Sequence, residues 1–289
     1  MAIRSWLFVP GDSEKKQSKA PGTGADVLIL DLEDSVVPDQ KPAAREMTCA
    51  WLKANRAGAA GRWVRINALD TPYWRDDLAA VMPGAPDGIM LPKSEGPDAV
   101  QQVAKELGGL EALHDLPAGS TRILPLVSET ASAALTIPAY VGRADPRLAG
   151  LTWGAEDLSA AIGASRKRDA AGRWTDTFRL VRSQTLLAAH ACSVAAIDTL
   201  HADFADTDGL KAAAEAARAD GFAGMLAIHP AQVAVINAAF TPSDAELAEA
   251  RAIVAAFAAD PSAGALQIDG KMIDRPHLKL AERILDAAG

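Results

Sequence analysis

Eight short apolar runs recur along the 289-residue chain, and they constrain its fold more than any other feature. Each run is continuously apolar or nearly so, which is typical of a strand buried on both faces of a sheet. The runs occupy residues 6–9, 27–30, 63–66, 88–91, 123–127, 148–153, 194–197 and 225–228.

Alanine-rich, amphipathic segments separate these runs, for example residues 99–107, 177–190 and 210–220. Strands that alternate with helices form a parallel sheet, and eight similar strand–helix units indicate closure into a barrel. An open doubly wound sheet is the alternative, which is weakened because no GxGxxG motif follows the first strand. We therefore predict an α/β fold with a (β/α)8 TIM barrel over residues 1–240.

The pattern changes after the eighth run, and residues 241–289 are not needed to close a barrel. Residues 241–258 have a helical pattern with Ser243 as N-cap. A loop, a β-like stretch over residues 265–273 and a helix from about Pro276 follow, the proline being suited to a first helical turn. We predict that this C-terminal extension is a helical lid or a subunit-exchange element.

Composition excludes several classes of protein. The net charge of −8 argues against a nucleic-acid partner, because nucleic-acid surfaces usually carry a basic excess. No apolar stretch approaches the ~18 residues of a membrane span, and the opening segment resembles a strand rather than a signal peptide. Cys49 and Cys192 stand apart with no CxxC motif, as expected for inert thiols in a reducing compartment. We therefore expect a cytoplasmic protein with no membrane segment.

Charged and amide side chains follow nearly every apolar run. Barrels of this type carry their active sites at the carboxyl ends of the strands. Charges near a barrel core are costly unless they are paired or bound to a metal, so this concentration predicts a functional site. The residues concerned are Asp31, Glu33, Asp34, Arg65, Asn67, Lys93, Glu129, Gly154, Ala155, Glu156, Asp157, Asp198 and His229.

The oxygen-rich character of this set indicates Mg²⁺, with Mn²⁺ possible, rather than zinc, since no cysteine or histidine cluster accompanies the carboxylates. Glu129 and Asp157 follow adjacent strands and could share one ion, with water and substrate completing its shell. Helix capping or local pairing with arginine would explain both residues without a metal. Position alone leaves both interpretations open.

Three further features could serve a ligand. Lys93 ends the fourth strand, where an imine-forming lysine would lie, so a Schiff-base lyase is the main chemical rival. His229 precedes a proline and either orients a ligand or bonds to the backbone. Two basic clusters either bind an anion or form solvated faces. They are Lys15, Lys16 and Lys19, and Arg166, Lys167 and Arg168.

Eight short motifs occur in order along almost the whole chain. They are RSWLFVPG from residue 4, LILDLEDSV from 28, VRIN from 64, MLPK from 90, VSET from 127, WGAEDL from 153, AIHP from 227 and KMIDRP from 271. Together they resemble the citrate lyase β-subunit family of the HpcH/HpaI aldolase superfamily, which includes CoA-ester lyases similar to malyl-CoA and citramalyl-CoA lyases. Ordered motifs are far more specific than any single one.

The resemblance assigns roles to several residues. It implies that Glu129 and Asp157 bind Mg²⁺ and that Arg65 contacts the substrate near a developing enolate. It also implies that Asp274 lies in a lid and reaches the active site of a neighbouring subunit in a homotrimer, or in a hexamer. An acidic cluster would support the arginine and the waters of the metal, namely Asp31, Glu33 and Asp34.

The resemblance further implies contacts with the acyl carrier. The first loop of the family helps to bind CoA, which would give Lys16 and Lys19 a phosphate-binding role. We expect the remaining strand-end residues to line the substrate or CoA site, namely Asn67, Lys93, Gly154, Ala155 and Glu156.

The activity implied is a Mg²⁺-dependent carbon–carbon lyase. Its substrate would be a 3-hydroxyacyl-CoA dicarboxylate such as malyl-CoA or citramalyl-CoA, cleaved to acetyl-CoA and a small 2-keto acid. The alternatives are a malyl-CoA-type thioesterase, a citrate lyase β-subunit acting on an acyl-carrier protein, and a metal-dependent 2-keto acid aldolase. A non-catalytic scaffold is disfavoured, because a scaffold has no need of this set of charged residues.

Overall fold

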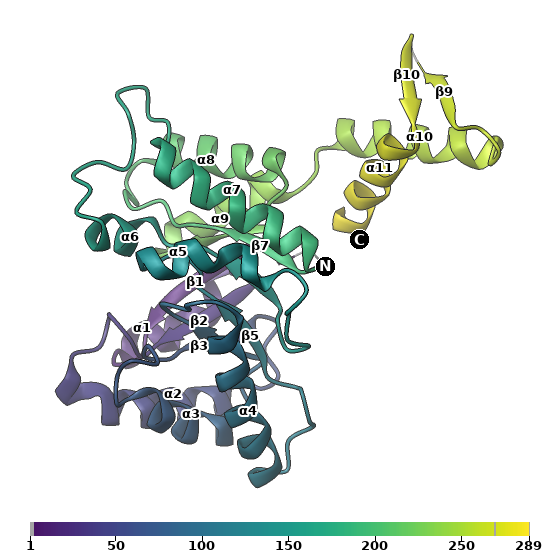
Figure 1. The fold of residues 1–289 in the computed structure, drawn as a ribbon. Coiled ribbons are helices and arrows are strands. Elements are labelled where there is room, and N and C mark those ends of the chain that lie inside the picture. The colour runs from purple at the N-terminus through teal and green to yellow at the C-terminus, as the bar shows by residue number, and fades with distance from the viewer. Residues whose placement is uncertain (1–2, 269, 289) are drawn as a thin grey trace.

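The computed structural model describes residues 3–268 and 270–288, and a barrel of parallel strands forms its main body (Figure 1). The hydrogen-bonded order is β5-β4-β3-β2-β1-β8-β7-β6, and isolated parallel bridges between Ile123 and Leu148 and between Leu126 and Thr152 join the two ends. The strands are β1 (Ser5–Pro10), β2 (Val27–Asp31), β3 (Gly61–Arg65), β4 (Gly88–Leu91), β5 (Arg122–Pro125), β6 (Gly150–Thr152), β7 (Ala195–Asp198) and β8 (Gly224–Ala227).

Helices connect successive strands and cover the outside of the barrel (Figure 1). The α-helices of this layer are α1 (Glu14–Lys19), α2 (Lys41–Ala54), α3 (Trp74–Val81), α4 (Pro97–Leu113), α5 (Ala131–Thr136), α6 (Ala155–Ala161), α7 (Asp176–Ala191), α8 (Thr207–Asp220) and α9 (Pro230–Phe240). Short 3₁₀ helices adjoin them, η1 (Ala20–Thr23), η2 (Pro38–Gln40), η3 (Met82–Gly84) and η4 (Ile137–Tyr140).

The predicted TIM barrel is confirmed, and each of the eight apolar runs overlaps one strand. The predicted bounds are least accurate where the barrel closes. The fifth and sixth runs extend beyond β5 and β6, because their outer residues pair only through the isolated bridges. Their apolar side chains are nevertheless buried, and burial is what the sequence pattern reports.

The two-residue period of the strands sorts side chains between the barrel interior and the helical layer. Trp6, Ile29 and Trp63 belong to the interior cluster, in which the two tryptophan rings meet edge to face with centroids 5.0 Å apart. Neighbouring residues such as Leu28 and Val64 pack outward in the larger cluster that the helices cover. Continuing the inward positions by two residues brings Asp31 and Arg65 to the carboxyl end of the barrel interior.

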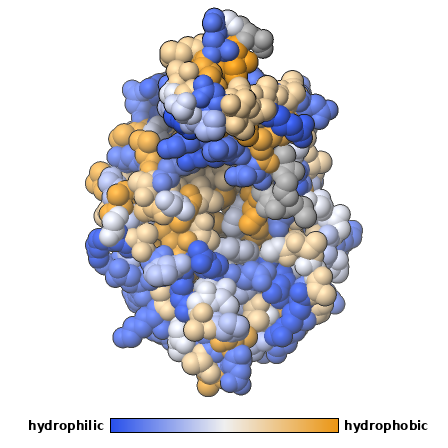
Figure 2. All heavy atoms as spheres, turned by 90° about the vertical axis from the view of Figure 1, so that its right-hand side faces the viewer, coloured by the Kyte–Doolittle hydropathy of each residue, from blue (hydrophilic) through white to orange (hydrophobic). Residues whose placement is uncertain are grey.

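The C-terminal extension forms a separate small unit that projects from the barrel (Figure 1). It contains α10 (Asp244–Ala259), the antiparallel hairpin of β9 (Ala265–Ile268) and β10 (Lys271–Asp274), and α11 (Arg275–Ala288). Its buried residues form a cluster of their own, Ala250, Ile253, Phe257, Ile273 and Ala281. Figure 2 shows hydrophobic residues beside hydrophilic ones on this projecting part.

The helix that follows the barrel begins as predicted, because Ser243 caps α10 and Glu246 completes a capping box. An ion pair of 2.7 Å between Arg218 and Glu246 joins the extension to α8 of the barrel. The division of the chain after residue 240 stays a prediction.

No helix in the described ranges 3–268 and 270–288 is both long enough and apolar enough to cross a membrane. Cys49 and Cys192 are free thiols, and each is half-buried.

We expect Gly88→Ala to destabilise the barrel, because a Cβ at Gly88 would lie 2.5 Å from the Trp63 ring. Overpacking of this kind typically costs about 1–3 kcal/mol. Gly109→Ala is the matched control, since a Cβ there meets nothing within 4 Å and alanine should stabilise α4 by about 1 kcal/mol. Urea unfolding measures both free energies, and wild-type stability of Gly88→Ala would contradict the tight packing around Trp63.

Candidate active site

A buried ion pair between two neighbouring strands forms the floor of the site. Asp31 and Arg65 are direct partners in the β2–β3 register, so both side chains rise from the barrel interior side by side. Arg65 donates from Nε to Asp31 Oδ1 at 2.7 Å and from Nη2 to Oδ2 at 2.8 Å. The Phe8 ring lies beneath the guanidinium, with 4.8 Å between the ring centroid and Cζ.

Both partners of this pair stay charged. Burial opposes the charge on Asp31, but the Arg65 guanidinium, Ser35 and the Glu33 N–H together hold the pKa of Asp31 below its usual range. Burial likewise opposes the charge on Arg65, and the carboxylates of Asp31 and Glu33 raise the pKa of Arg65. Asp31 occupies only two of the five N–H donors of the guanidinium, which leaves the others for further contacts.

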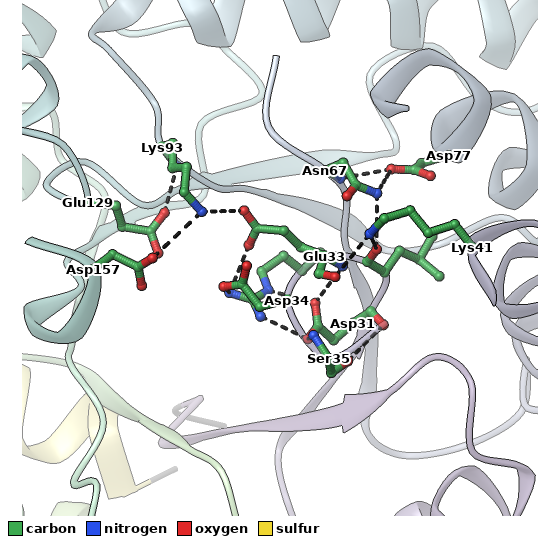
Figure 3. A network of polar contacts seen from close by, with 12 residues as sticks. Asp31, Glu33, Asp34, Ser35, Lys41, Asn67, Asp77, Lys93, Glu129 and Asp157 are labelled. Carbon is green, nitrogen blue, oxygen red and sulfur yellow. Dashed lines mark hydrogen bonds and ion pairs between the residues drawn. The ribbon is translucent and has the colours of Figure 1, made fainter. Parts of the chain in front are cut away.

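The acidic loop after β2 continues the network on the other side of Arg65. Arg65 Nη1 lies 3.0 Å from Glu33 Oε2 and 3.6 Å from Asp34 Oδ2. Lys41 fixes this loop from below, donating to the carbonyls of Leu32 at 2.9 Å and Glu33 at 3.0 Å. Figure 3 shows the Glu33 side chain extending from this loop toward Lys93.

Asn67 supports the same loop rather than the cavity. Its side-chain amide donates to Leu32 O at 3.0 Å and to Asp77 Oδ2 at 2.7 Å, and it is buried. It is not among the residues that line the cavity described below, although we predicted a substrate contact from its position at a strand end. The structure therefore shows Asn67 holding the backbone that carries Glu33.

Lys93 connects the acidic loop to a second group of carboxylates (Figure 3). Its Nζ lies 2.6 Å from Glu33 Oε1 and 3.7 Å from Asp157 Oδ1, while its backbone N–H donates to Glu129 Oε2 at 2.6 Å. Burial opposes its charge, but Glu33 and Glu129 raise the pKa of Lys93 above its usual value. A lysine held as an ammonium is a poor imine-forming nucleophile, so this geometry disfavours the Schiff-base alternative.

Glu129 is a deeply buried carboxyl with like charges beside it. Burial first, and then the charges of Glu33 and Asp157, raise the pKa of Glu129 to about 8. Gly154 makes room for this side chain, because a Cβ there would lie 3.0 Å from Glu129 Cγ. Ser128 joins the loop after β5 to the loop after β6 by accepting a hydrogen bond of 3.0 Å from the Gly154 N–H.

The side chains of Glu129 and Asp157 lie next to each other in Figure 3, and they fit a divalent cation. Their mutual repulsion, which raises the pKa of Glu129, is what a bound cation would relieve. Within the described part of the chain, no group of three or more His, Cys, Asp or Glu side chains is arranged to hold a metal. Two carboxylates completed by water and substrate are typical of Mg²⁺.

One cavity of about 740 Å³ joins these elements at the carboxyl end of the barrel. It brings together most of the residues that the sequence predicted for the site. They are Asp31, Asp34, Arg65, Glu129, Gly154, Ala155, Glu156 and Asp157, together with Lys16 and Lys19 of α1. Lys15, Ser13 and Thr23 also line it, so the carboxylates share this cavity with the basic residues of α1.

Asp274 is not brought to this cavity. It ends β10 in the projecting unit, where it is half-buried and accepts a hydrogen bond from its neighbour His277. The expected role of Asp274 concerns a neighbouring subunit, so this position in one chain leaves that role a prediction.

The basic cluster after α6 is largely engaged within the chain. Lys167 pairs with Glu156, and Arg168 lies over the Trp174 ring at 3.6 Å. The two interpretations of His229 are compatible, because its Nδ1 accepts the Ala231 N–H at 3.2 Å while the residue also lines the cavity.

Sequence reasoning missed two residues that shape the site. The Phe8 ring packs against the Arg65 guanidinium. Its inward position could have been deduced from the alternation of inward and outward side chains along β1. Lys41 is a buried cation held by backbone carbonyls, and no local pattern distinguishes it from a solvent-exposed lysine.

Comparison with known proteins agrees with this geometry. The profile of the family described as "HpcH/HpaI aldolase/citrate lyase" matches residues 4–230. The chain belongs to this family. The match spans all eight strands of the barrel and ends where α9 begins.

Relatives with different named activities cover almost the whole chain. The (3S)-malyl-CoA thioesterase of Cereibacter sphaeroides is 35% identical over 288 residues, which are 99% of this chain and 94% of that protein. The mitochondrial citramalyl-CoA lyase of Rattus norvegicus is 33% identical over 300 residues, covering 99% of this chain and 86% of that protein.

A solved structure is also similar in both sequence and fold. The protein CitE of Mycobacterium tuberculosis, in complex with magnesium, acetoacetate and coenzyme A, is 38% identical with a TM-score of 0.81. The comparison covers 100% of this chain and 98% of that one, so it includes the C-terminal extension.

The metal-free protein should lose stability as the pH rises from about 5 to about 8, because folded Glu129 holds a proton that the unfolded chain releases. Glu129→Gln should abolish this loss, so we expect it to exceed wild type in free energy of unfolding at pH 8.5, on the order of a few kcal/mol, and to match it near pH 5. Urea unfolding in EDTA at both pH values measures this. Exposed Glu46→Gln is the control, and a pH-independent difference would contradict the raised pKa.

Proposed function

We propose that this protein is a Mg²⁺-dependent carbon–carbon lyase acting on a 3-hydroxyacyl-CoA dicarboxylate such as malyl-CoA or citramalyl-CoA. The products would be acetyl-CoA and a 2-keto acid. The observation that carries the proposal is the shared cavity, which is lined both by Arg65, Glu129 and Asp157 and by the lysines of α1. The cavity thus combines a site for a metal-bound hydroxy acid with cations suited to the phosphates of CoA.

Glu129 and Asp157 would hold the metal. Mg²⁺ supplies Lewis-acid polarisation and lowers the pKa of a bound hydroxyl. Fixed by the Lys93 N–H and by the packing against Gly154, Glu129 is oriented before any ligand arrives. Such preorganisation is what makes a charged group effective in catalysis.

Arg65 would stabilise the enolate of the thioester that forms as the carbon–carbon bond breaks. Its guanidinium is held by Asp31 and by the Phe8 ring, so its direction is fixed and its charge is permanent. A cation placed where charge develops contributes to the transition state more than to substrate binding. Asp274 of a neighbouring chain would then deliver the proton to the enolate carbon.

The named relatives support a CoA thioester substrate, and they also support a second candidate. A thioesterase would bind the same ligand and direct water to the thioester carbonyl, as the name of the Cereibacter relative indicates for that protein. A citrate lyase β-subunit working on an acyl-carrier protein would use the same barrel with a larger carrier. A 2-keto acid aldolase would leave the α1 lysines without a phosphate to bind.

Product analysis by NMR tests these activities directly. We expect malyl-CoA or citramalyl-CoA with Mg²⁺ to give acetyl-CoA and glyoxylate or pyruvate, and EDTA to abolish the reaction. Free CoA with an intact hydroxy diacid would overturn the lyase in favour of the thioesterase. No turnover of either thioester would point to a carrier-protein substrate or to a free keto acid.

Mixed subunits test the proposed homotrimer or hexamer. Asp157→Asn and Asp274→Asn should each lose about 10²–10³ in rate, as removal of one charged catalytic group does. If Asp274 serves a neighbour, unfolding and co-refolding the two inactive variants should restore about a quarter of wild-type activity, because some sites combine both intact residues. The matched control for the single variants is Asp208→Asn, which changes an exposed aspartate in the first turn of α8 and should keep wild-type activity. No recovery in mixtures would contradict shared sites.

A further inference from the structure

Lys93 has a backbone conformation that lysine rarely adopts. Its φ is +48°, in the left-handed region that favours glycine. The next residue fixes this turn, because the Ser94 N–H donates a hydrogen bond of 3.0 Å to the carbonyl of Leu126, which directly follows β5. Unfavourable backbone conformations persist where surrounding contacts enforce them, and they gather at functional sites.

In this conformation Lys93 contacts one carboxylate through its backbone N–H and another through its side-chain ammonium. The backbone N–H donates to Glu129 Oε2 at 2.6 Å, which orients a carboxylate that lines the cavity. The side-chain ammonium of Lys93 lies 2.6 Å from Glu33 Oε1. The same ammonium lies 3.7 Å from Asp157 Oδ1, so it stands between Glu33 and the proposed metal ligands.

Glu33 is the carboxylate that could disturb the metal site. It is buried, and its Oε1 lies 2.6 Å from the same Lys93 ammonium that lies 3.7 Å from Asp157 Oδ1. In the described part of the chain its Oε2 accepts no hydrogen bond, although Arg65 Nη1 lies 3.0 Å away. An oxygen of this kind is a good ligand for Mg²⁺.

We propose that Lys93 is a positioning residue that keeps Glu33 out of the metal's coordination shell and thereby reserves open positions for the substrate. The inference rests on the proposed metal site of Glu129 and Asp157. It adds that the ammonium of Lys93, by pairing with Glu33, limits the protein to two carboxylate ligands. Two ligands leave positions at which a 2-keto acid can bind through its carboxylate and carbonyl oxygens.

Opposite effects on metal and substrate follow from this arrangement. The Lys93 ammonium repels a cation at Asp157, so wild-type metal affinity is lower than these carboxylates would otherwise give. Removal of the ammonium eliminates that repulsion and leaves Glu33 paired with Arg65 alone, so that its Oε1 can become a third ligand. The metal should then bind more tightly. The keto acid should bind more weakly, because Glu33 takes one of the four positions that two ligands leave open and because the site becomes more negative toward an anion. A residue needed only for folding would weaken both.

Mn²⁺ binding followed by electron paramagnetic resonance tests the inference, with pyruvate added to the Mn²⁺-loaded protein. We expect Lys93→Met to lower the Kd for Mn²⁺ by about tenfold, as loss of a nearby like charge does. We expect it to raise the Kd for pyruvate by a similar factor. Water-proton relaxation should report fewer exchangeable waters on the bound Mn²⁺ than in wild type.

Lys93→Gly covers the case in which the methionine variant fails to fold, because glycine accepts φ of +48° and keeps the N–H to Glu129. It should reproduce both changes. Lys93→Arg keeps the positive charge and should stay near wild type for Mn²⁺. Lys211→Met controls for loss of a lysine charge, since Lys211 also pairs with a glutamate but lies on α8, and both Kd values should stay at the wild-type level.

Weaker or unchanged Mn²⁺ binding in both Lys93→Met and Lys93→Gly would overturn the inference while leaving the metal site in place. Tighter Mn²⁺ binding with unchanged pyruvate binding would also overturn it, because Glu33 would then not occupy a substrate position. Wild-type protein that binds no Mn²⁺ would overturn the proposed metal site and this inference together.

Discussion

The buried pair of Asp31 and Arg65 is the interaction on which the rest of the site depends. It is a consequence of the barrel, because the two residues are register partners on β2 and β3 and both face inward. From this pair, contacts of alternating charge run through Glu33 to Lys93 and on to the carboxylates of Glu129 and Asp157. A buried charge is costly when it loses its partner, so each link of the network constrains the next.

The charges of this network do not balance, and the imbalance has a chemical meaning. With the exposed Asp34 set aside, four carboxyl groups contact the two cationic residues Arg65 and Lys93, namely those of Asp31, Glu33, Glu129 and Asp157. An excess of two negative charges is therefore left at the end that contains Glu129 and Asp157. Protonation of Glu129 relieves half of it in the metal-free protein, whereas a divalent cation would neutralise it fully.

The sequence predicted the barrel well, because strands buried on both faces must be continuously apolar and their inward period brings Asp31 and Arg65 to one end. The strand ends also predicted most of the carboxylates that line the cavity, although Glu33 and Lys93 are not among its lining residues. The sequence could not predict that Asn67 turns away to hold Leu32, since that depends on the buried Asp77 of another element. Nor could it predict the left-handed turn at Lys93, because a lysine at that position gives no local signal.

Relatives named as a lyase and as a thioesterase both cover nearly all of this chain, so the barrel residues alone do not separate the two reactions. Both reactions need a polarised thioester, and they differ in what approaches it, a proton donor for carbon or a water molecule. The proposed metal ligands and Arg65 would serve either course. Under the proposed reaction, the difference would lie in groups that reach the thioester from outside the barrel, and Asp274 in the projecting unit is the group we propose for this role. A lid that brings a carboxylic acid and excludes water favours protonation of the enolate, whereas a site that admits water favours hydrolysis.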